Sequence, residues 1–218
     1  MIRYPAGTKP KRVQSIPGQL ASSRPYSSVG RGMTLEKDIN ETNQYYNETL
    51  RALVFKKPTP VNIVHVEYPQ RSAAVIREAY FQKASTVDYS GVYQGKALEF
   101  EAKETRSKTN FPLDNFHAHQ IEHLRKALYH GAIAFVIVRF TSLEKTYWLD
   151  ACHVIEHYRK QAEGGRKSIP LSCFQKKGYE IPISYGASVD YLQVIDQLLF
   201  SSETIETIET VIENHRHI

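Results

Sequence analysis

A tight turn at Gln94-Gly95 constrains the fold of this chain more than any other feature of its sequence. The pair lies between two runs rich in β-branched and aromatic residues, a pattern typical of a two-residue hairpin loop. With this loop, Tyr93 faces Lys96 and fixes the register of both strands. Side chains alternate along a strand, so one face of the second strand turns toward a core. The residues on that face are Leu98, Phe100 and Ala102.

Four polar side chains converge on the other face of this hairpin. Counting outward from the turn places Asp88 opposite Glu101 and Thr86 opposite Lys103. Opposed carboxylates repel across a strand pair, and Mg²⁺ would remove the repulsion because it binds through one or two carboxylates and keeps sites for water and phosphate. Lys103 is then placed to orient a water or to neutralise charge on a phosphate. The alternative is a solvated strand face on which Lys103 pairs with Asp88 or Glu101.

Length and composition favour one soluble domain with appendages. The chain has 218 residues, no apolar run as long as a membrane span, and no apolar stretch typical of a signal peptide at its N-terminus. Its two cysteines, Cys152 and Cys173, lie far apart and outside any CxxC pair, which fits free thiols in a reducing compartment. We therefore expect a cytoplasmic protein with no membrane partner.

The net charge of +5 is concentrated in the first 31 residues, which carry six basic residues and no acidic one. These are Arg3, Lys9, Lys11, Arg12, Arg24 and Arg31. The segment is rich in Pro, Gly and Ser, so it is expected to be disordered when free and attracted to polyanions. A merely solubilising tail is the alternative. At the other end, residues 203–218 form an acidic near-repeat to which the sequence assigns no role.

The remaining patterns predict a mixed α/β sheet. Thr34 is expected to cap a helix over 35–53, and Asp114 a second helix closed by Gly131. The nearly continuous apolar run at 132–140 is typical of a buried central strand. The other expected elements are a hairpin of strands 61–68 and 74–81 joined by a turn at 69–72, a strand at 145–151, a helix at 151–161, a basic loop at 163–170 and a last helix from Asp190.

Other candidate sites are weaker. His119 and His123 have the i,i+4 spacing of a zinc pair, but the segment HQIEH lacks the glutamate that a metalloprotease motif needs. A second zinc site can be drawn from Cys152, His153, His157 and Cys173, although nothing fixes their distances. The sequence contains no Gly-rich phosphate loop and no G-x-S-x-G elbow. Gln120 either reaches over the Glu101 strand to a metal-bound water or is a boundary glutamine.

The order of elements and the D-x12-E-x-K hairpin resemble the PD-(D/E)xK nuclease core, a restriction-endonuclease-like mixed sheet flanked by helices. More specifically, four segments are similar to the RecU-type Holliday-junction resolvases, including the unusual inserted hairpin at about 61–81. They are 32-GMTLEKDINETNQYY-46, 57-KPTPVNIVHVEYPQRSAAVIREAYF-81, 97-ALEFEAKETRSKTNFPLDNFHAHQIEHL-124 and 164-GGRKSIP-170. The resemblance divides the chain into a tail at 1–31, a nuclease domain at 32–200 and an extension at 201–218.

This resemblance implies a homodimeric endonuclease that resolves four-way DNA junctions with Mg²⁺, or with Mn²⁺ as a substitute, during recombination and repair. The metal-site residues of the family match Thr86, Asp88, Glu101 and Gln120, its transition-state stabiliser matches Lys103, and Glu36 is a further candidate carboxylate. The inserted hairpin matches the stalk that enters the junction centre. Its expected DNA contacts are Arg71, Arg77, Tyr80 and Phe81, with Arg31 from the tail. A recombinase and a branch-migration helicase are the expected protein partners.

Two other functions fit part of the sequence. A non-catalytic architectural DNA- or RNA-binding protein would account for the basic tail and the hairpin, but it leaves Asp88 opposite Glu101 without a purpose. A restriction-type nuclease would use the same catalytic residues on plain duplex DNA. It would not need a projecting hairpin.

Overall fold

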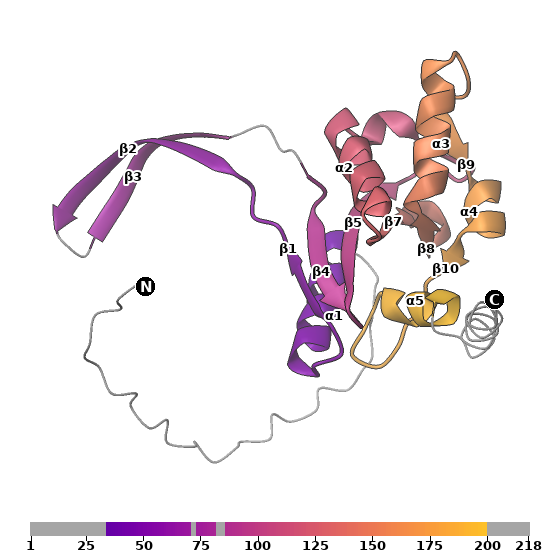
Figure 1. Ribbon diagram of the computed structural model, residues 1–218, viewed down its shortest axis with the longest axis horizontal. Helices are drawn as coiled ribbons and strands as arrows, with labels where there is room; N and C mark the ends of the chain where they lie inside the picture. The colour runs from indigo at the N-terminus through magenta and orange to yellow at the C-terminus, as the bar shows by residue number, and fades with distance from the viewer. Residues whose placement is uncertain (1–33, 71–72, 82–85, 200–218) are drawn as a thin grey trace, which may run out of the picture.

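The computed structural model describes residues 34–70, 73–81 and 86–199 (Figure 1). The basic tail, the C-terminal extension, Arg31 and Arg71 lie outside these ranges. The helices are α1 (Leu35–Glu48), α2 (Ala118–Tyr129), α3 (Ala151–Ala162), α4 (Leu171–Lys177) and α5 (Tyr191–Leu199), with 3-10 turns η1 (Leu113–Asn115) and η2 (Thr141–Leu143). The strands are β1 (Leu53–Lys56), β2 (Val61–Gln70), β3 (Ala73–Phe81), β4 (Tyr89–Tyr93), β5 (Lys96–Thr105), β6 (Asn110–Pro112), β7 (Ile133–Phe140), β8 (Lys145–Asp150), β9 (Ser168–Pro170) and β10 (Tyr179–Glu180).

A six-stranded sheet in the order β1-β4-β5-β7-β8-β10 forms the centre of the molecule. The β5–β7 pair is parallel, and every other neighbouring pair is antiparallel. The apolar run that predicted a central strand is β7, which pairs along its length with β5 and β8. The predicted mixed-sheet α/β fold is therefore confirmed.

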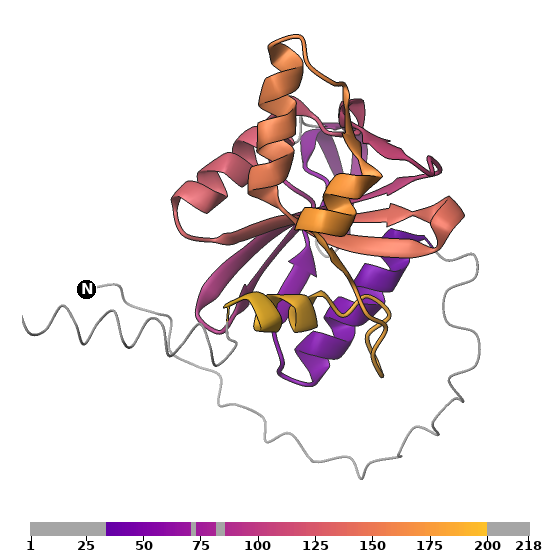
Figure 2. The same ribbon diagram turned by 90° about the vertical axis from the view of Figure 1, so that its right-hand side faces the viewer.

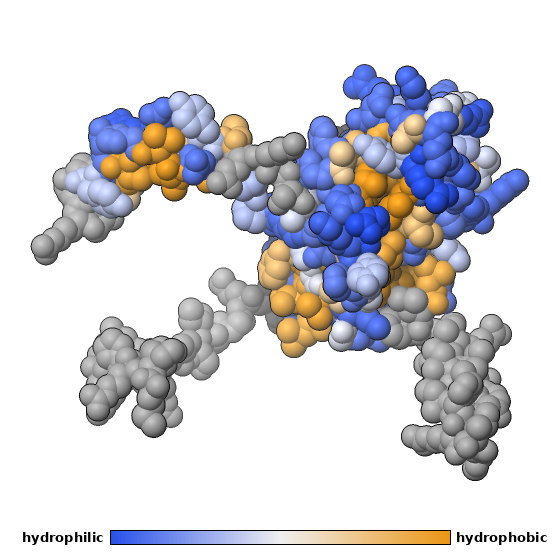
Figure 3. Space-filling view, turned by 45° about the horizontal axis from the view of Figure 1, so that its top comes forward, coloured by the Kyte–Doolittle hydropathy of each residue, from blue (hydrophilic) through white to orange (hydrophobic). Residues whose placement is uncertain are grey.

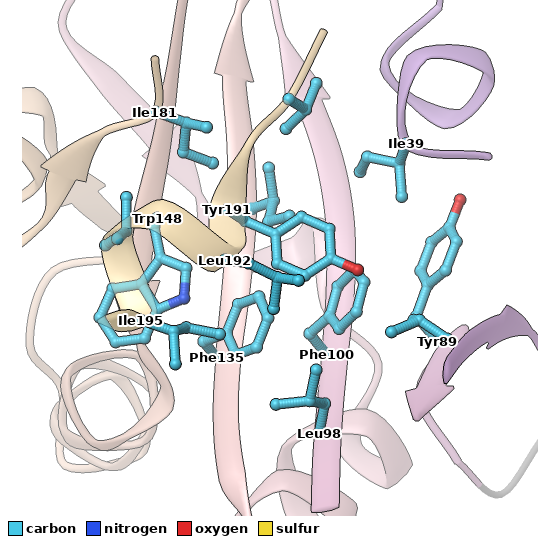
Figure 4. Packing of buried hydrophobic residues seen from close by; sticks show 14 of the residues in the cluster. Ile39, Tyr89, Leu98, Phe100, Phe135, Trp148, Ile181, Tyr191, Leu192 and Ile195 are labelled. Atoms are coloured by element: carbon cyan, nitrogen blue, oxygen red, sulfur yellow. The ribbon is translucent and has the colours of Figure 1, made fainter. Parts of the chain in front are cut away.

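Helices cover both faces of this sheet (Figures 1 and 2). On one face, α1 and α5 pack over Phe100 and Phe135, and Figure 4 shows Tyr191 and Leu192 of α5 beside these two rings. On the other face, α2 and α3 bury Val136 of β7 in a second apolar cluster. Each face of β7 thus packs into its own core, whereas β5 places apolar side chains only on the α1 face.

Two polar contacts hold the start of α1 against the sheet. The backbone N–H of Leu35 donates to Glu104 Oε1 on β5 at 2.8 Å. Asp38 is buried and forms a 2.6 Å ion pair with Arg139 at the end of β7. As predicted, Thr34 caps the helix by accepting from the backbone N–H of Lys37. The first turn of α1 is therefore fixed beside the carboxyl end of β5.

The predicted end of this helix is wrong, because α1 stops at Glu48 rather than near Leu53. The chain reverses at Leu50, whose φ of +56° lies in the left-handed region. The Asn47 side chain then donates to and accepts from the backbone of Val54, at 3.1 and 2.9 Å. These two bonds fix residues 53–56 as an edge strand against β4, an element that the sequence pattern did not indicate.

The C-terminal part of the described chain closes the α1 face of the sheet. Asp190 is buried, accepts from the Tyr46 hydroxyl at 2.6 Å and forms an ion pair with Arg51 at 3.0 Å. The next residue, Tyr191, donates its hydroxyl to Asn43 at 2.6 Å. The predicted last helix is thus confirmed as α5, and its start is bonded to the first helix.

The hairpin β2–β3 is a separate two-stranded sheet that projects away from the body of the molecule (Figure 1). We call residues 61–81 the stalk. Apolar residues gather on its surface (Figure 3), and Ile63, Val64, Ile76 and Phe81 are all exposed. The predicted inserted hairpin is confirmed, with strands slightly longer than expected.

Two further local predictions are wrong. Asp114 lies in η1 and does not cap α2, because Phe116 and His117 are extended and the helix begins only at Ala118. The segment expected to be a basic loop at 163–170 ends in β9, which pairs with β6. In the described part of the chain, no helix is both long and apolar enough to cross a membrane.

Candidate active site

The turn at Gln94-Gly95 forms as predicted. Both residues have positive φ, +45° and +75°, as a type I′ turn requires. The ladder then runs without a shift from Tyr93↔Lys96 to Tyr89↔Phe100. This register places Asp88 beside the face of β5 that carries Glu101.

The ladder ends one pair before the predicted Asp88–Glu101 pair. Asp88 instead donates its backbone N–H to Glu101 Oε2 at 3.1 Å, and its carbonyl accepts from the backbone N–H of Lys57 at 2.7 Å. The predicted pairing of Thr86 with Lys103 is therefore wrong. The chain bends here, and Val87 enters the core on the α2 side. The Thr86 hydroxyl donates to the carbonyl of Val87 at 3.2 Å.

Glu101 is the most unusual group in this region because its carboxylate is fully buried. Its pKa is raised from 4.5 to about 7, chiefly by burial; the Lys103 ammonium opposes this rise and the neighbouring Asp88 adds to it. The Lys103 ammonium lies 2.8 Å from Glu101 Oε1, yet that oxygen has no hydrogen bond of good geometry among the described residues. A buried carboxylate oxygen that lacks a directed donor can accept another cationic partner.

Glu36 reaches this region from α1. Its carboxylate is exposed and forms a 2.6 Å ion pair with Lys56 on β1. The pKa of Tyr89 is raised by burial and then by the charges of Glu36, Asp88 and Glu101. All three carboxylates therefore lie within electrostatic reach of one phenol, which is consistent with the prediction that Glu36 belongs to the site.

Gln120 is buried on the first turn of α2. Its side-chain oxygen accepts from the backbone N–H of His117 at 2.9 Å, so it stabilises the start of the helix. That oxygen is the atom that a metal would use.

A second polar cluster, centred on Glu99, lies on the same face and was not predicted from the sequence. Glu99 accepts from Lys57 Nζ at 2.8 Å and from the Ser90 hydroxyl at 2.6 Å, and its Oε2 lies 2.8 Å from His123 Nε2 on α2. Lys57 lowers the pKa of Glu99 against the effect of burial. The sequence does contain an indication of this cluster, because Glu99 precedes Glu101 by two residues and so lies on the same face of the strand.

The residues present fit a hard divalent cation. Asp88 and Glu101 supply adjacent carboxylates, and Mg²⁺ needs only one or two with the rest of its shell taken from water and substrate. Within the described ranges, no three His, Cys, Asp or Glu side chains are grouped closely enough to hold a metal. The two zinc alternatives, His119 with His123 and the set around Cys152, receive no support.

The stalk carries the expected contact residues that fall within the described ranges. Phe81 and Tyr80 are strongly exposed, and the Tyr80 hydroxyl donates to Glu78 at 2.6 Å. Arg77 is exposed and forms a 2.7 Å ion pair with Glu67 on the opposite strand.

The family model described as Recombination protein U matches residues 30–197. The chain belongs to the RecU family. Among curated members, it is 52% identical over 201 residues to the Holliday junction resolvase RecU of Geobacillus kaustophilus, covering 92% of this chain and 98% of that protein. It is 46% identical over 202 residues to the protein of the same name from Limosilactobacillus fermentum, covering 93% and 96%.

A more distant likeness links this RecU family member to a solved structure, the Holliday junction resolvase Hjc of Archaeoglobus fulgidus. The match covers 63% of this chain and 93% of that one, with a TM-score of 0.35 and 13% sequence identity.

Proposed function

We propose that this protein is a structure-selective endonuclease that resolves Holliday junctions by paired, Mg²⁺-dependent phosphodiester hydrolysis in DNA recombination and repair. Its membership of the RecU family supports the reaction class. The observation that carries the proposal is the fully buried Glu101 carboxylate, which lies beside Asp88 and Lys103. An architectural DNA-binding protein would have no use for two adjacent carboxylates near phosphate.

Asp88 and Glu101 would hold the Mg²⁺ ion, or Mn²⁺ in its place. Bound there, the cation supplies a nucleophilic hydroxide near neutral pH and relieves charge on the phosphate. Lys103 brings an ammonium group to the same point and stabilises the negative charge that develops on the phosphate oxygens. Thr86 and Gln120 orient water through their polar side chains, and Glu36 adds a third carboxylate at the edge of the site.

We assign recognition of the four-way junction to the stalk. A junction differs from duplex DNA in having an open centre, and a projecting hairpin with exposed aromatic residues can fill it. Tyr80 and Phe81 would stack on unpaired bases, while Arg71 and Arg77 would meet the surrounding phosphates. Arg31 and the rest of the basic tail would add contacts to phosphate without structural selectivity.

Two incisions in a junction of near-twofold symmetry require two active sites, which a C2 homodimer provides. An exposed apolar strip at the edge of the sheet supports this assembly. Leu53 and Val92 are register neighbours on β1 and β4, and both are more than half exposed, as is Phe55. Exposed apolar side chains on an edge strand are typical of a surface that is covered by a partner. We place this dimer in the cytoplasm, with a recombinase and a branch-migration helicase as its protein partners.

The proposal is tested with a four-way junction and duplexes of the same arm sequences, each incubated with the protein and Mg²⁺ or with EDTA. We expect paired nicks in the junction alone and only with the metal. Asp88→Asn should abolish cleavage yet keep junction binding, because loss of a negative charge does not weaken attraction to phosphate. Near-normal cleavage by this variant would overturn the site assignment.

The same experiment distinguishes a junction-resolving enzyme from a nuclease that cuts plain duplex DNA. Sequence-dependent cutting of the duplex, with no preference for the junction, would identify a restriction-type nuclease instead. Sedimentation of the same preparation measures the assembly, and a monomer that still makes paired cuts would contradict the homodimer.

A further inference from the structure

The acidic segment at residues 203–213, ETIETIETVIE, has a regular pattern that the nuclease function does not use. It follows the end of the family match at residue 197. Ile205, Ile208 and Ile212 have the i, i+3, i+7 spacing that puts side chains on one face of a helix. In the same helix, Glu203 and Glu206 would lie on the opposite side. The sequence therefore predicts an amphipathic helix that needs an apolar surface.

A cavity of about 480 Å³ lies where α5 ends, bordered also by β7, β8, β10 and the start of α3. Its apolar lining includes Ile133, Trp148, Ile195 and Leu198. Figure 4 shows Trp148 and Ile195 lying next to each other at one end of the main core. Ile133 and Leu198 are only partly buried there, so an apolar partner could cover more of their surface.

The charges around this cavity are complementary to the segment. Lys96 and Lys177 belong to the lining and are exposed, and His153 lies beside them. The one acidic residue of the lining is Asp150. Glutamates on the outer side of a docked helix would face this basic edge while the isoleucines enter the cavity.

Only a short stretch of chain separates the cavity from the acidic segment. Leu198 lines the cavity, and Glu203 follows it by five residues. As a helix, residues 203–213 would be about 16 Å long at 1.5 Å per residue. A short tether of this kind holds a segment at an effective concentration of about 1 mM, so weak intrinsic affinity suffices.

We propose that residues 203–213 fold back as an amphipathic helix and dock their isoleucine face into the cavity at the end of α5. The partner of this surface is thus a segment of the same chain. Docking does not depend on the nuclease reaction, and so it is testable in the absence of DNA and metal.

Trp148 is the single tryptophan of the chain and lines the cavity, so its fluorescence reports on docking. The triple variant Ile205→Ser, Ile208→Ser, Ile212→Ser should make Trp148 more accessible to acrylamide quenching than in the wild type. The matched triple variant Glu203→Gln, Glu206→Gln, Glu213→Gln keeps the apolar face and should retain the protection in high salt. Equal quenching of the wild type and the isoleucine variant would overturn the proposal.

A second measurement uses a chain that ends at Phe200, beyond the family match. A peptide of residues 201–218 should protect Trp148 in this chain saturably, and a scrambled peptide should not. At the tethered concentration of about 1 mM, a Kd at or below about 0.1 mM would make the docked state at least about tenfold more populated than the undocked state. Protection of Trp148 that needs only the glutamates would instead identify a purely ionic contact. Protection that rises with protein concentration in the full chain would identify a second copy of the chain as the partner.

Discussion

The stalk and the active-site hairpin are consecutive β-hairpins with opposite environments. The β4–β5 hairpin keeps one register from its turn to Tyr89 and buries Leu98 and Phe100 in the core. The β2–β3 hairpin shifts register at three points, and most of its apolar side chains are exposed. A buried face fixes register because a slip of one residue would turn the core residues outward. The stalk lacks this constraint, and so it can tolerate irregular pairing and present side chains to a partner.

The two hairpins nevertheless meet at one point. Lys57 lies just before the first strand of the stalk, and Thr86 follows shortly after the second. The backbone N–H of Lys57 donates to the carbonyl of Asp88, and its ammonium group contacts Glu99 on β5. The irregular hairpin is thus anchored beside the metal-ligand candidate of the regular one.

Lys103→Ala tests the chemical role of the buried hairpin and should have the largest effect. Loss of one electrostatic donor at a transition state costs about 2–4 kcal/mol, or roughly 30- to 1,000-fold in rate. The rate is measured in a single turnover with junction already bound. Lys145→Ala, which removes a surface ion pair with Glu180, is the control and should cleave normally. A rate within a few-fold of wild type would favour a plain Lys103–Glu101 salt bridge.

Glu101→Gln tests whether the buried carboxylate of the β4–β5 hairpin lowers the free energy of unfolding. The folded-state pKa of Glu101 is raised from 4.5 to about 7, so its protonated form is favoured in the fold. The stability that this gives is complete below pH 4.5 and is lost as the pH rises through 7, a change on the order of 3 kcal/mol at about 1.36 kcal/mol per pKa unit. In EDTA, the variant should therefore melt higher than wild type at pH 8 and about equally at pH 4.5.

The control for this experiment is Glu122→Gln, which removes an exposed carboxylate whose pKa is lowered by Arg125. That variant should gain no stability at pH 8. Equal melting of Glu101→Gln and wild type at both pH values would show that burial of Glu101 imposes no penalty.

Replacing residues 69–76 with a short Gly-Ser turn tests the exposed hairpin. The variant should remain a folded dimer with normal duplex affinity but lose its preference for the four-way junction. Phe81→Ala is the finer change and should weaken junction binding by about 1–3 kcal/mol if the ring stacks on one base. Tyr129→Ala is a matched control, because Tyr129 and Phe81 are both 82% exposed. Junction preference that survives in the folded turn variant would place recognition elsewhere.

Deleting residues 1–31 should leave junction preference unchanged, in contrast to the stalk variant. The six positive charges of this tail should contribute up to about 5 to the slope of log K against log salt, at roughly 0.9 per phosphate contact. Binding titrations at several salt concentrations measure the slope for junction and duplex alike. An unchanged slope would mean that the tail does not contact DNA.

The sequence predicted the regular hairpin better than its surroundings. Gln94-Gly95 specifies its turn locally, and simple counting then brought Asp88 to Glu101. The bend that buries Val87 depends on a core formed by distant elements, so no local pattern indicated it. The strand β1 was missed for a similar reason. Its pairing depends on Asn47 and on a left-handed residue, Leu50, which is unusual for a leucine.

Closure of the α1 face by Asp190 and Tyr191 has a consequence for synthesis on the ribosome. Tyr46 emerges early, but its hydroxyl partner Asp190 follows 144 residues later. At about 5–20 residues per second, that interval lasts roughly 7–30 s. During this time Phe100 and Phe135 emerge without Tyr191, the ring that covers them in the finished protein. The nascent chain therefore presents one apolar face of its central sheet to the cell until Asp190 and Tyr191 have been synthesised.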